Sequence, residues 1–383
     1  MKNMVGQTPR GDDFYPRDSI ISKIYRRLES GSHLFLSAPR RSGKTSIMRY
    51  MDDFPNDKYA FVYITVEDVE DVEEYFRVLS EELLESEALS KLVKTSKNVY
   101  DIIQDFGNRI KKVKIWEFEI ETQSSSKPTY RQEFESLLKK LDTDGFTIGL
   151  LIDEFPVALE NIAKKHGAQA AVEFLHANRT LRQKAKPGLL FIYTGSIGLP
   201  NIARKLDATA TINDINVVEI PPLTSEEAKD LSEKLFKSYS IKCSDGAIDY
   251  MLSKIEWLMP FFVQLVVQMV IDEVESNTKT VSNKVIDQVL EKASNHRNNI
   301  YFENYYSRLQ KTLPKEEAAL AKKILYEIAH KGQITIEEAK QLDPVGNVLE
   351  ILEFDGYINA DQHHYRFNSP ILRLWWLKFA QPN

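Results

Sequence analysis

The segment SAPRRSGKTS, residues 37–46, restricts the possible folds of this chain more than any other feature. It follows a short apolar run at 34–37 and precedes a stretch in which apolar residues recur with helical spacing. A strand, a loop that ends in Gly-Lys-Thr and a helix, in that order, are typical of a phosphate-binding P-loop. The amides of such a loop and the N-terminus of its helix present donors and a positive dipole to a phosphate. The segment therefore predicts a phosphate site in an α/β domain.

Three adjacent residues of this loop have the properties needed to bind a nucleotide together with magnesium. Gly43 lets the chain approach a phosphate closely, and Lys44 would reach the β- and γ-phosphates. The Thr45 hydroxyl would coordinate Mg²⁺, which prefers oxygen ligands. Ala38 stands where the motif usually has its first glycine. The residues predicted to contact the nucleotide are Pro39, Arg40, Arg41, Ser42, Gly43, Lys44, Thr45 and Ser46.

Three further apolar segments, at 60–66, 148–152 and 189–194, have the composition of parallel strands covered on both faces by helices. With the run at 34–37 they make four buried strands that alternate with helical segments, which predicts a doubly wound α/β sheet. Between the second and third strands, the alternating pattern at 112–121 predicts an extra strand, and the polar tract QSSSKP after it predicts a mobile loop.

A second motif, GLLIDEFP, places Asp153 and Glu154 at the carboxyl end of the third apolar strand. In a parallel sheet this end lies beside the phosphate site. Asp153 would hold magnesium, directly or through water, and Glu154 would orient and polarise the water that attacks the γ-phosphate. The alternative, two solvated carboxylates, fits poorly with the apolar residues before the pair and with Pro156 after it. The motif predicts ATP hydrolysis as well as binding.

Two further positions are candidates for contact with the γ-phosphate. Thr194 and Ser196 follow the fourth strand, where a polar group can contact that phosphate or its water, although a plain turn is the alternative. The predicted helix at 172–184 carries Arg179 and Arg182, and oligomeric ATPases often present an arginine there to a neighbouring subunit. A solvated basic face is the alternative for this helix. Ser196 and Arg182 are the two residues that we predict to assist catalysis.

The rest of the chain predicts two further domains. After Pro221 and Pro222, Thr224 has the context of a helix N-cap and opens a region of helical periodicity. From residue 311 the expected order is helix, short strand, two helices and a hairpin at 357–367, which is the order of a winged helix. The predicted domains are a P-loop ATPase domain at 1–221, a helical lid at 222–310 and a winged-helix domain at 311–383.

Five segments, FYPRDSIISKI, APRRSGKT, LLIDEFP, YTGSIGLP and YRFNSPILRLWW, together resemble the archaeal-type ATPases of the STAND class in the AAA+ superfamily. The resemblance covers nearly the whole chain. It implies a molecular switch that binds ATP or ADP with Mg²⁺ and hydrolyses ATP. In such a switch the nucleotide state controls how the lid and the winged helix pack, and thereby controls a partner.

The resemblance also implies which residues lie beside the adenine. The entry pattern F-x-x-R of that family corresponds to Phe14, Tyr15 and Arg17 in this chain. An ordinary first-turn cap of the helix that follows is the alternative explanation of these residues. In the lid, the family has a glycine-x-proline signature. Pro260 matches its proline, but Leu258 stands in the place of its glycine, so only Pro260 is carried over.

Composition limits the partners of the chain. The net charge of -6 and the pI near 5.8 provide no general attraction to nucleic acid or to anionic membranes. The single cysteine, Cys243, excludes an intrachain disulfide and a cysteine-based zinc cluster. The N-terminus lacks the apolar core of a signal peptide, and the longest apolar stretches are shorter than a membrane span. These features predict a cytoplasmic protein that has no membrane partner.

Local charge bears on whether the winged helix binds DNA. The candidate recognition helix, 345–355, contains three carboxylates and no Lys or Arg, which disfavours insertion into the major groove. Residues 311–383 carry nine Lys or Arg against ten Asp or Glu, a net charge of about -1 that supplies little affinity through counterion release. These charges favour a protein partner or a homo-oligomer. A DNA-associated ATPase similar to origin-recognition proteins is the alternative, and a small-molecule kinase is disfavoured by Glu154 and the winged helix.

Overall fold

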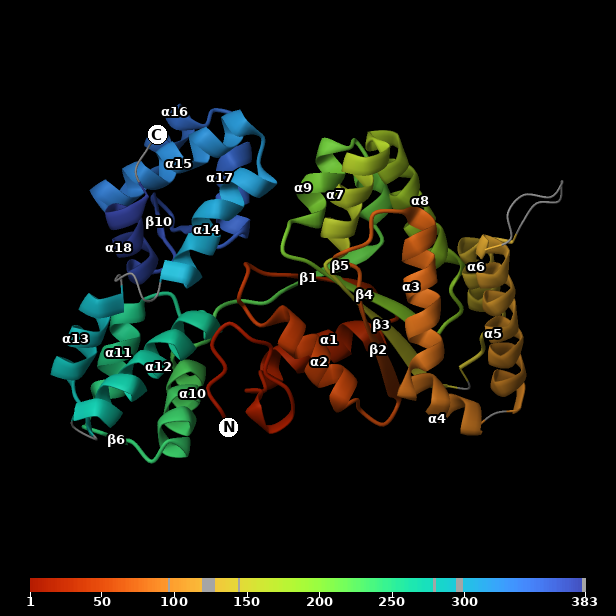
Figure 1. Cartoon of the computed structure of the whole chain (residues 1–383), viewed down its shortest axis with the longest axis horizontal. Coiled ribbons are helices and arrows are strands. Elements are labelled where there is room, and N and C mark those ends of the chain that lie inside the picture. The colour runs from red at the N-terminus through yellow and green to blue at the C-terminus, as the bar shows by residue number, and fades with distance from the viewer. Residues whose placement is uncertain (96, 119–127, 144, 278–279, 294–298, 381–383) are drawn as a thin grey trace. The chain divides into compact units, whose positions relative to one another are not determined.

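The computed structural model of the chain describes residues 1–95, 97–118, 128–143, 145–277, 280–293 and 299–380 (Figure 1). Contacts within the chain separate two compact units. The first, which we call the sheet unit, comprises Pro16–Ser37 and Lys44–Ile220. The second, the C-terminal unit, comprises Met1–Tyr15, Ala38–Gly43 and Pro221–Asn383, and therefore includes six residues of the predicted P-loop.

A five-stranded parallel sheet, in the order β2-β3-β4-β1-β5, forms the centre of the sheet unit. The four predicted strands are confirmed. The fifth, at the edge beside β1, was not predicted because Asn216 and Val217 are exposed and the strand therefore lacks a continuous apolar run. The strands are β1 (His33–Ser37), β2 (Tyr59–Thr65), β3 (Thr147–Asp153), β4 (Leu189–Thr194) and β5 (Ile215–Glu219).

Helices connect these strands, as parallel pairing requires. One prediction is wrong here: part of the segment 112–121 continues a helix, α5, whose buried residues Val99, Ile103, Phe106 and Ile110 recur every three or four positions. Residues 119–127, including most of the QSSSKP tract, lie outside the described residues. The helices are α1 (Asp18–Glu29), α2 (Lys44–Asp53), α3 (Val72–Glu85), α4 (Glu87–Thr95), α5 (Lys97–Phe118), α6 (Tyr130–Lys140), α7 (Phe155–His166), α8 (Ala168–Lys184), α9 (Leu199–Lys205) and the 3₁₀ turn Thr209–Ile212.

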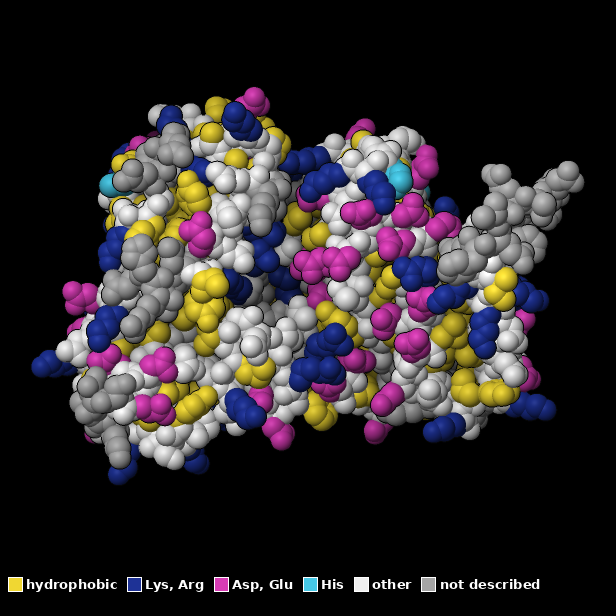
Figure 2. Space-filling view, in the orientation of Figure 1, with side chains coloured by type: hydrophobic (Ala, Val, Ile, Leu, Met, Phe, Trp, Pro, Cys, Tyr) yellow, Lys and Arg dark blue, Asp and Glu magenta, His cyan; other side chains and the backbone are white. Residues whose placement is uncertain are grey.

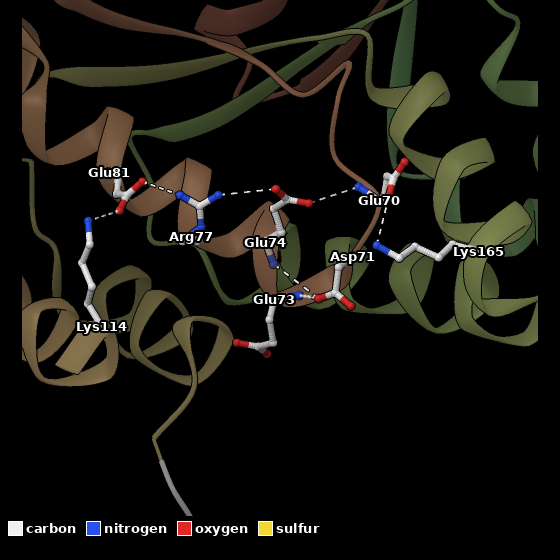
Figure 3. Close-up of polar contacts among 8 residues, drawn as sticks. All are labelled: Glu70, Asp71, Glu73, Glu74, Arg77, Glu81, Lys114 and Lys165. Carbon is white, nitrogen blue, oxygen red and sulfur yellow. Dashed lines mark hydrogen bonds and ion pairs between the residues drawn. The ribbon is translucent and has the colours of Figure 1, made fainter. Parts of the chain in front are cut away.

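Acidic side chains gather around the start of α3, and much of their charge is paired (Figures 2 and 3). Asp71 caps the helix by accepting from the amides of the second and third helical residues. Arg77 pairs with Glu74 and Glu81 within the helix, and Lys165 pairs with Glu70. Exposed pairs of this kind are screened by water and salt, so they add little stability.

In the C-terminal unit, the helix predicted after Thr224 is confirmed together with its cap. Thr224 and Glu227 form a reciprocal capping box at the start of α10. The first part of the unit consists of the 3₁₀ turn Gly11–Asp13, α10 (Ser225–Ser238), β6 (Lys242–Cys243), α11 (Ala247–Ile255), α12 (Pro260–Asn277), β7 (Thr280–Val281), α13 (Asn283–Ala293) and α14 (Asn299–Thr312). Within the described ranges, no helix is long and apolar enough to cross a membrane.

The last part of the unit has the predicted winged-helix order. Its small antiparallel sheet is arranged β8-β10-β9, and the hairpin turn is closed by Asp361, which accepts from the amides of His363 and His364. Trp375 and Trp376 are each 1% exposed and belong to one apolar core that runs from Leu223 to Ala380. The elements are α15 (Lys315–Lys331), β8 (Gln333–Thr335), α16 (Ile336–Leu342), α17 (Asn347–Phe354), β9 (Ile358–Ala360), β10 (His364–Phe367) and α18 (Pro370–Phe379).

Candidate nucleotide and magnesium site

The loop between β1 and α2 contains two left-handed residues, which are a feature of anion-binding nests. Two of its residues have positive φ, Arg41 at 64° and Gly43 at 90°, whereas Ala38 does not. Alternation of right- and left-handed residues turns successive amides toward one point, where an anion can bind. The Ser42 hydroxyl is buried and has no hydrogen-bond partner among the described residues, as expected of a loop that contacts a ligand. The loop therefore fits a bound phosphate.

Within the sheet unit, the predicted magnesium ligands lie together. The Thr45 hydroxyl, in the first turn of α2, donates a hydrogen bond of 2.8 Å to Oδ2 of Asp153 at the end of β3. Asp153 is only 4% exposed, and Lys44 at the start of α2 is 7% exposed. A hydroxyl and a carboxylate at this spacing are oxygen ligands of the kind that Mg²⁺ binds beside nucleotide phosphates. The donor set fits magnesium.

Tyr63 is a further member of this site that the sequence reasoning missed. Its hydroxyl donates to the same Oδ2 of Asp153 at 2.6 Å. Burial, and then the neighbouring Asp153 charge, raise the pKa of Tyr63, so it remains a protonated donor at neutral pH. The Arg49 guanidinium lies 3.4 Å from the centre of the Tyr63 ring. The sequence signal that could have identified Tyr63 is a tyrosine near the carboxyl end of an otherwise apolar strand.

The predicted base, Glu154, contacts the predicted polar residue Ser196. Both the Ser196 amide and its hydroxyl donate to Oε2 of Glu154, each at 2.8 Å. Glu154 has a left-handed backbone, with φ 60° and ψ 30°, and immediately precedes α7. Burial raises the pKa of Glu154 and the Asp153 charge adds to this, while the Ser196 bonds and Lys44 oppose it. The carboxylate is thus held in one orientation in a site that tunes its basicity.

Gly195 permits this contact and was also missed. A Cβ at Gly195 would overlap the Pro156 ring, whose Cγ would lie 2.8 Å away. The absence of a side chain lets the end of β4 approach the start of α7 closely enough for Ser196 to reach Glu154. A glycine next to a polar residue at a strand end was the only sequence signal.

We expect Gly195→Ala to reduce ATP turnover about tenfold while nucleotide affinity stays within about twofold of the wild type. The added methyl group would displace Pro156 and misalign Glu154, and misplacement of about 1 Å is enough for such a loss. Steady-state hydrolysis and nucleotide titration measure the two effects. Gly107→Ala is the matched control, because its Cβ would meet only the Leu84 side chain at 3.7 Å. Equal turnover in both variants would contradict this role of Gly195.

The prediction that Arg182 acts at a neighbour's phosphate is wrong. Its side chain is 2% exposed, and its Nε and Nη2 donate to the Asp214 carboxylate at 2.8 Å each. Nη2 also donates to the Thr211 carbonyl at 2.6 Å. Asp214 directly precedes β5, so this ion pair lies at the amino end of the sheet, whereas the P-loop follows the carboxyl end of β1. Burial also rules out the solvated basic face for Arg182.

Arg182→Met should lower the free energy of unfolding by about 1–2 kcal/mol, since the partly exposed Asp214 can regain water when its partner is lost. Burial acts to raise the pKa of Asp214, but the Arg182 bonds outweigh it and the pKa is lowered. The stabilisation is therefore complete above the ordinary value of 3.8 and is lost as pH falls through the lowered pKa. Denaturant unfolding at pH 7 and pH 3 tests this, with Arg179→Met as control. Equal stability of the two variants at pH 7 would refute the assignment.

The structure places the residues of the expected adenine pocket as follows. Phe14 is 8% exposed, and the Tyr15 hydroxyl donates to Asp230 at 2.8 Å within the C-terminal unit. Arg17, in the sheet unit, is 3% exposed and occupies the N-cap position of α1, with its carbonyl accepting from the first-turn amides of the helix. Adenine contact by these three residues stays a prediction.

Pro260 begins α12, and the residue after it contacts the P-loop. The Arg41 guanidinium lies 3.9 Å from the centre of the Phe261 ring and 5.0 Å from that of Tyr305. All three residues belong to the C-terminal unit by their contacts. Because Arg41 has a Cβ at positive φ, its backbone conformation costs about 1–2 kcal/mol, which these contacts can offset. Phe261 and Tyr305 were not predicted from the sequence.

The fold of this chain is similar to those of several solved structures. No family model matches the sequence, and none of the curated proteins searched matches it. The Walker-type ATPase PABY2304 of Pyrococcus abyssi matches with a TM-score of 0.60 over 97% of this chain and 99% of that chain, at 16% identity. The chain therefore shares the overall fold of this Walker-type ATPase. The ORC2 protein of Aeropyrum pernix, in its ADPNP-ADP complexes, matches with a TM-score of 0.52 over 95% and 94% of the two chains, at 11% identity. At these identities the likeness concerns the fold alone.

Proposed function

We propose that this chain is a magnesium-dependent ATPase that works as a nucleotide-controlled switch of the STAND kind. One observation carries the proposal: Thr45 donates a hydrogen bond of 2.8 Å to Asp153. This bond joins the two motifs, because buried Lys44 precedes Thr45 and Glu154, which Ser196 orients, follows Asp153. A chance Gly-Lys-Thr sequence has no reason to be joined in space to an Asp-Glu pair 108 positions later. ATP and ADP are the expected nucleotides, and the ORC2 relative in fold was solved with ADPNP and ADP.

Each residue of the site has a separate proposed role in the reaction. Lys44 and the loop amides would hold the β- and γ-phosphates, and Thr45 and Asp153 would hold the metal. When bound, Mg²⁺ would neutralise charge that develops on the phosphate oxygens. Glu154 would orient the attacking water in line with the γ-phosphate and accept its proton. Ser196 positions that carboxylate through its two hydrogen bonds.

Several features support a switch rather than a fast enzyme. Ser196 donates two hydrogen bonds to Oε2 of Glu154 in this structure, so this oxygen of the proposed base is already engaged by the protein. The lid and winged-helix parts share one apolar core, so a change in the packing of one part alters the packing of the other. We expect slow basal turnover that rises on homo-oligomerisation or on binding a protein partner.

A DNA-associated role is disfavoured by the winged helix itself. In α17, which corresponds to the recognition helix, Glu350 is exposed and Glu353 is half-buried. Carboxylates on this surface would repel the DNA backbone. Duplex DNA is still included in the test below, because the alternative predicts a distinct result.

Steady-state ATP hydrolysis with and without Mg²⁺ tests the proposal, with each condition repeated in the presence of duplex DNA at moderate salt. Molecular mass in solution is measured in parallel. Slow, magnesium-dependent turnover that ignores DNA, together with assembly in ATP, is the expected result. Turnover stimulated by DNA would favour the DNA-associated ATPase, and phosphate transfer to an added nucleoside would favour a kinase.

A further inference from the structure

Arg41 occupies a position where the backbone conformation favours glycine. Its φ of 64° is one of two left-handed conformations in the loop, and such conformations help to turn backbone amides toward an anion. Side chains with a Cβ rarely adopt this conformation, and a loop built in this way relaxes unless other contacts hold it. The contacts of Arg41 are therefore important for the shape of the loop.

Those contacts come from helices outside the sheet unit. The Arg41 guanidinium lies over the rings of Phe261, in the first turn of α12, and Tyr305, in α14. Both rings are buried, at 4% and 6% exposure, and the Tyr305 carbonyl accepts from the Tyr357 hydroxyl at 2.6 Å. The Nη1 atom of Arg41 is buried and makes no hydrogen bond among the described residues, whereas the two rings lie against its guanidinium. Such contacts are substantial when desolvated.

The winged-helix part also approaches the loop closely at a second position. A Cβ at Gly356, which has φ of 78°, would lie 3.0 Å from Cβ of Pro39. Gly356 follows Asp355, whose carboxylate pairs with Arg308 of α14 at 3.2 Å. Pro39 and Arg41 of the loop thus both lie close to residues of the C-terminal unit.

We propose that Arg41 is a positioning residue through which the C-terminal unit sets the shape of the phosphate loop. Phe261 and Tyr305 hold the Arg41 side chain, and this keeps the strained backbone at 41 in the form that binds phosphate. Nucleotide affinity then depends on whether α12 and α14 are packed on the loop. By linkage, bound nucleotide favours that packing to the same degree. The inference rests on the proposed function, because it concerns binding at the same site.

A double-mutant cycle tests the coupling by nucleotide titration. Arg41→Ala keeps the Cβ and loses the ring contacts, so its Kd for ATP should rise about tenfold. Arg41→Gly also loses the contacts but removes the strain, and it should bind at least about threefold more tightly than Arg41→Ala. Phe261→Leu should raise Kd about threefold to tenfold in the wild type and by less than about twofold in the Arg41→Gly protein.

Phe262→Leu is the matched control for the aromatic substitution. Phe262 is the neighbouring residue in α12, is 2% exposed, and does not lie under the Arg41 guanidinium in the part of the chain that the structure describes. It should leave Kd within about twofold of the wild type. If Phe261→Leu weakens binding equally in both backgrounds, or if Arg41→Ala and Arg41→Gly bind alike, the proposal is overturned. The comparison of Arg41→Ala with Arg41→Gly changes no residue of the apolar core.

Amide hydrogen exchange separates failure of this inference from failure of the proposed function. It is measured on the nucleotide-free protein, over the peptide that covers residues 38–43. Phe261→Leu should increase exchange in this peptide at least about fivefold, whereas Phe262→Leu should not. If the wild-type protein binds no nucleotide but the two variants differ in exchange as expected, the ATPase proposal alone is refuted. Equal exchange in the two variants would refute the role of Arg41.

Discussion

Glu154→Gln is expected to lower ATP turnover by about 10²- to 10³-fold while ATP binding remains within about threefold of the wild type, because removal of a general base typically has an effect of this size. The amide has the shape of the carboxylate and can still accept from Ser196, so the fold around β4 and α7 should be retained. It is too weak a base to accept a proton from water. Single-turnover hydrolysis and nucleotide titration measure the two effects.

The pH dependence of turnover follows from the same residue. Glu154 must be ionised to accept a proton, and burial raises its pKa above the ordinary value of 4.5. The rate should therefore fall as pH decreases through this raised pKa, at a higher pH than for an exposed glutamate. Glu173→Gln on the exposed face of α8 is the control and should leave the rate and its acid limb unchanged. A Glu154→Gln protein with the wild-type rate would remove this residue from the mechanism.

Lys44→Ala should weaken ATP binding about a hundredfold, since a charge-assisted bond contributes roughly 1.5–3 kcal/mol and two phosphate groups are involved. Lys44 is 7% exposed at the first residue of α2, so its ammonium acts where water is largely excluded. AMP, which lacks the β- and γ-phosphates, should bind the wild type and the variant almost equally. Isothermal titration with ATP and with AMP measures both affinities.

The control for Lys44→Ala is Lys237→Ala, which removes an exposed ammonium from α10. It should leave both affinities unchanged. Unchanged ATP affinity in Lys44→Ala, or an equal loss for ATP and AMP, would contradict the assignment of this lysine to the outer phosphates.

The parts of the fold that were predicted correctly depend on local patterns. Continuous apolar runs identify strands covered on both faces, which is why β1 to β4 were found. β5 was missed because it lies at the sheet edge with Val217 51% exposed. The strand predicted at 112–121 was wrong at residues 112–118, because the short alternating pattern also fits a helix when the preceding residues, such as Ile103 and Ile110, continue the helical period.

In the candidate site too, residues within local motifs were predicted, whereas contacts between residues distant in the sequence were missed. Spacing within two short motifs was enough to predict that Thr45 and Asp153 lie together. The contacts of Tyr63, Gly195 and Phe261 join residues far apart in the chain, and no local pattern specifies such contacts. Arg182 was misplaced because position in a helix does not reveal which end of the sheet the side chain reaches.

Titration of the wild-type protein and of Asp153→Asn with ATP, each with and without Mg²⁺, tests the central claim most directly. Asparagine still accepts from the hydroxyls of Thr45 and Tyr63 but lacks the charge that would hold the metal. We predict that Mg²⁺ increases the ATP affinity of the wild type at least about tenfold and that of Asp153→Asn by less than about twofold. If the wild type binds no ATP, or if Mg²⁺ strengthens binding equally in both proteins, these residues do not form the nucleotide and magnesium site described above.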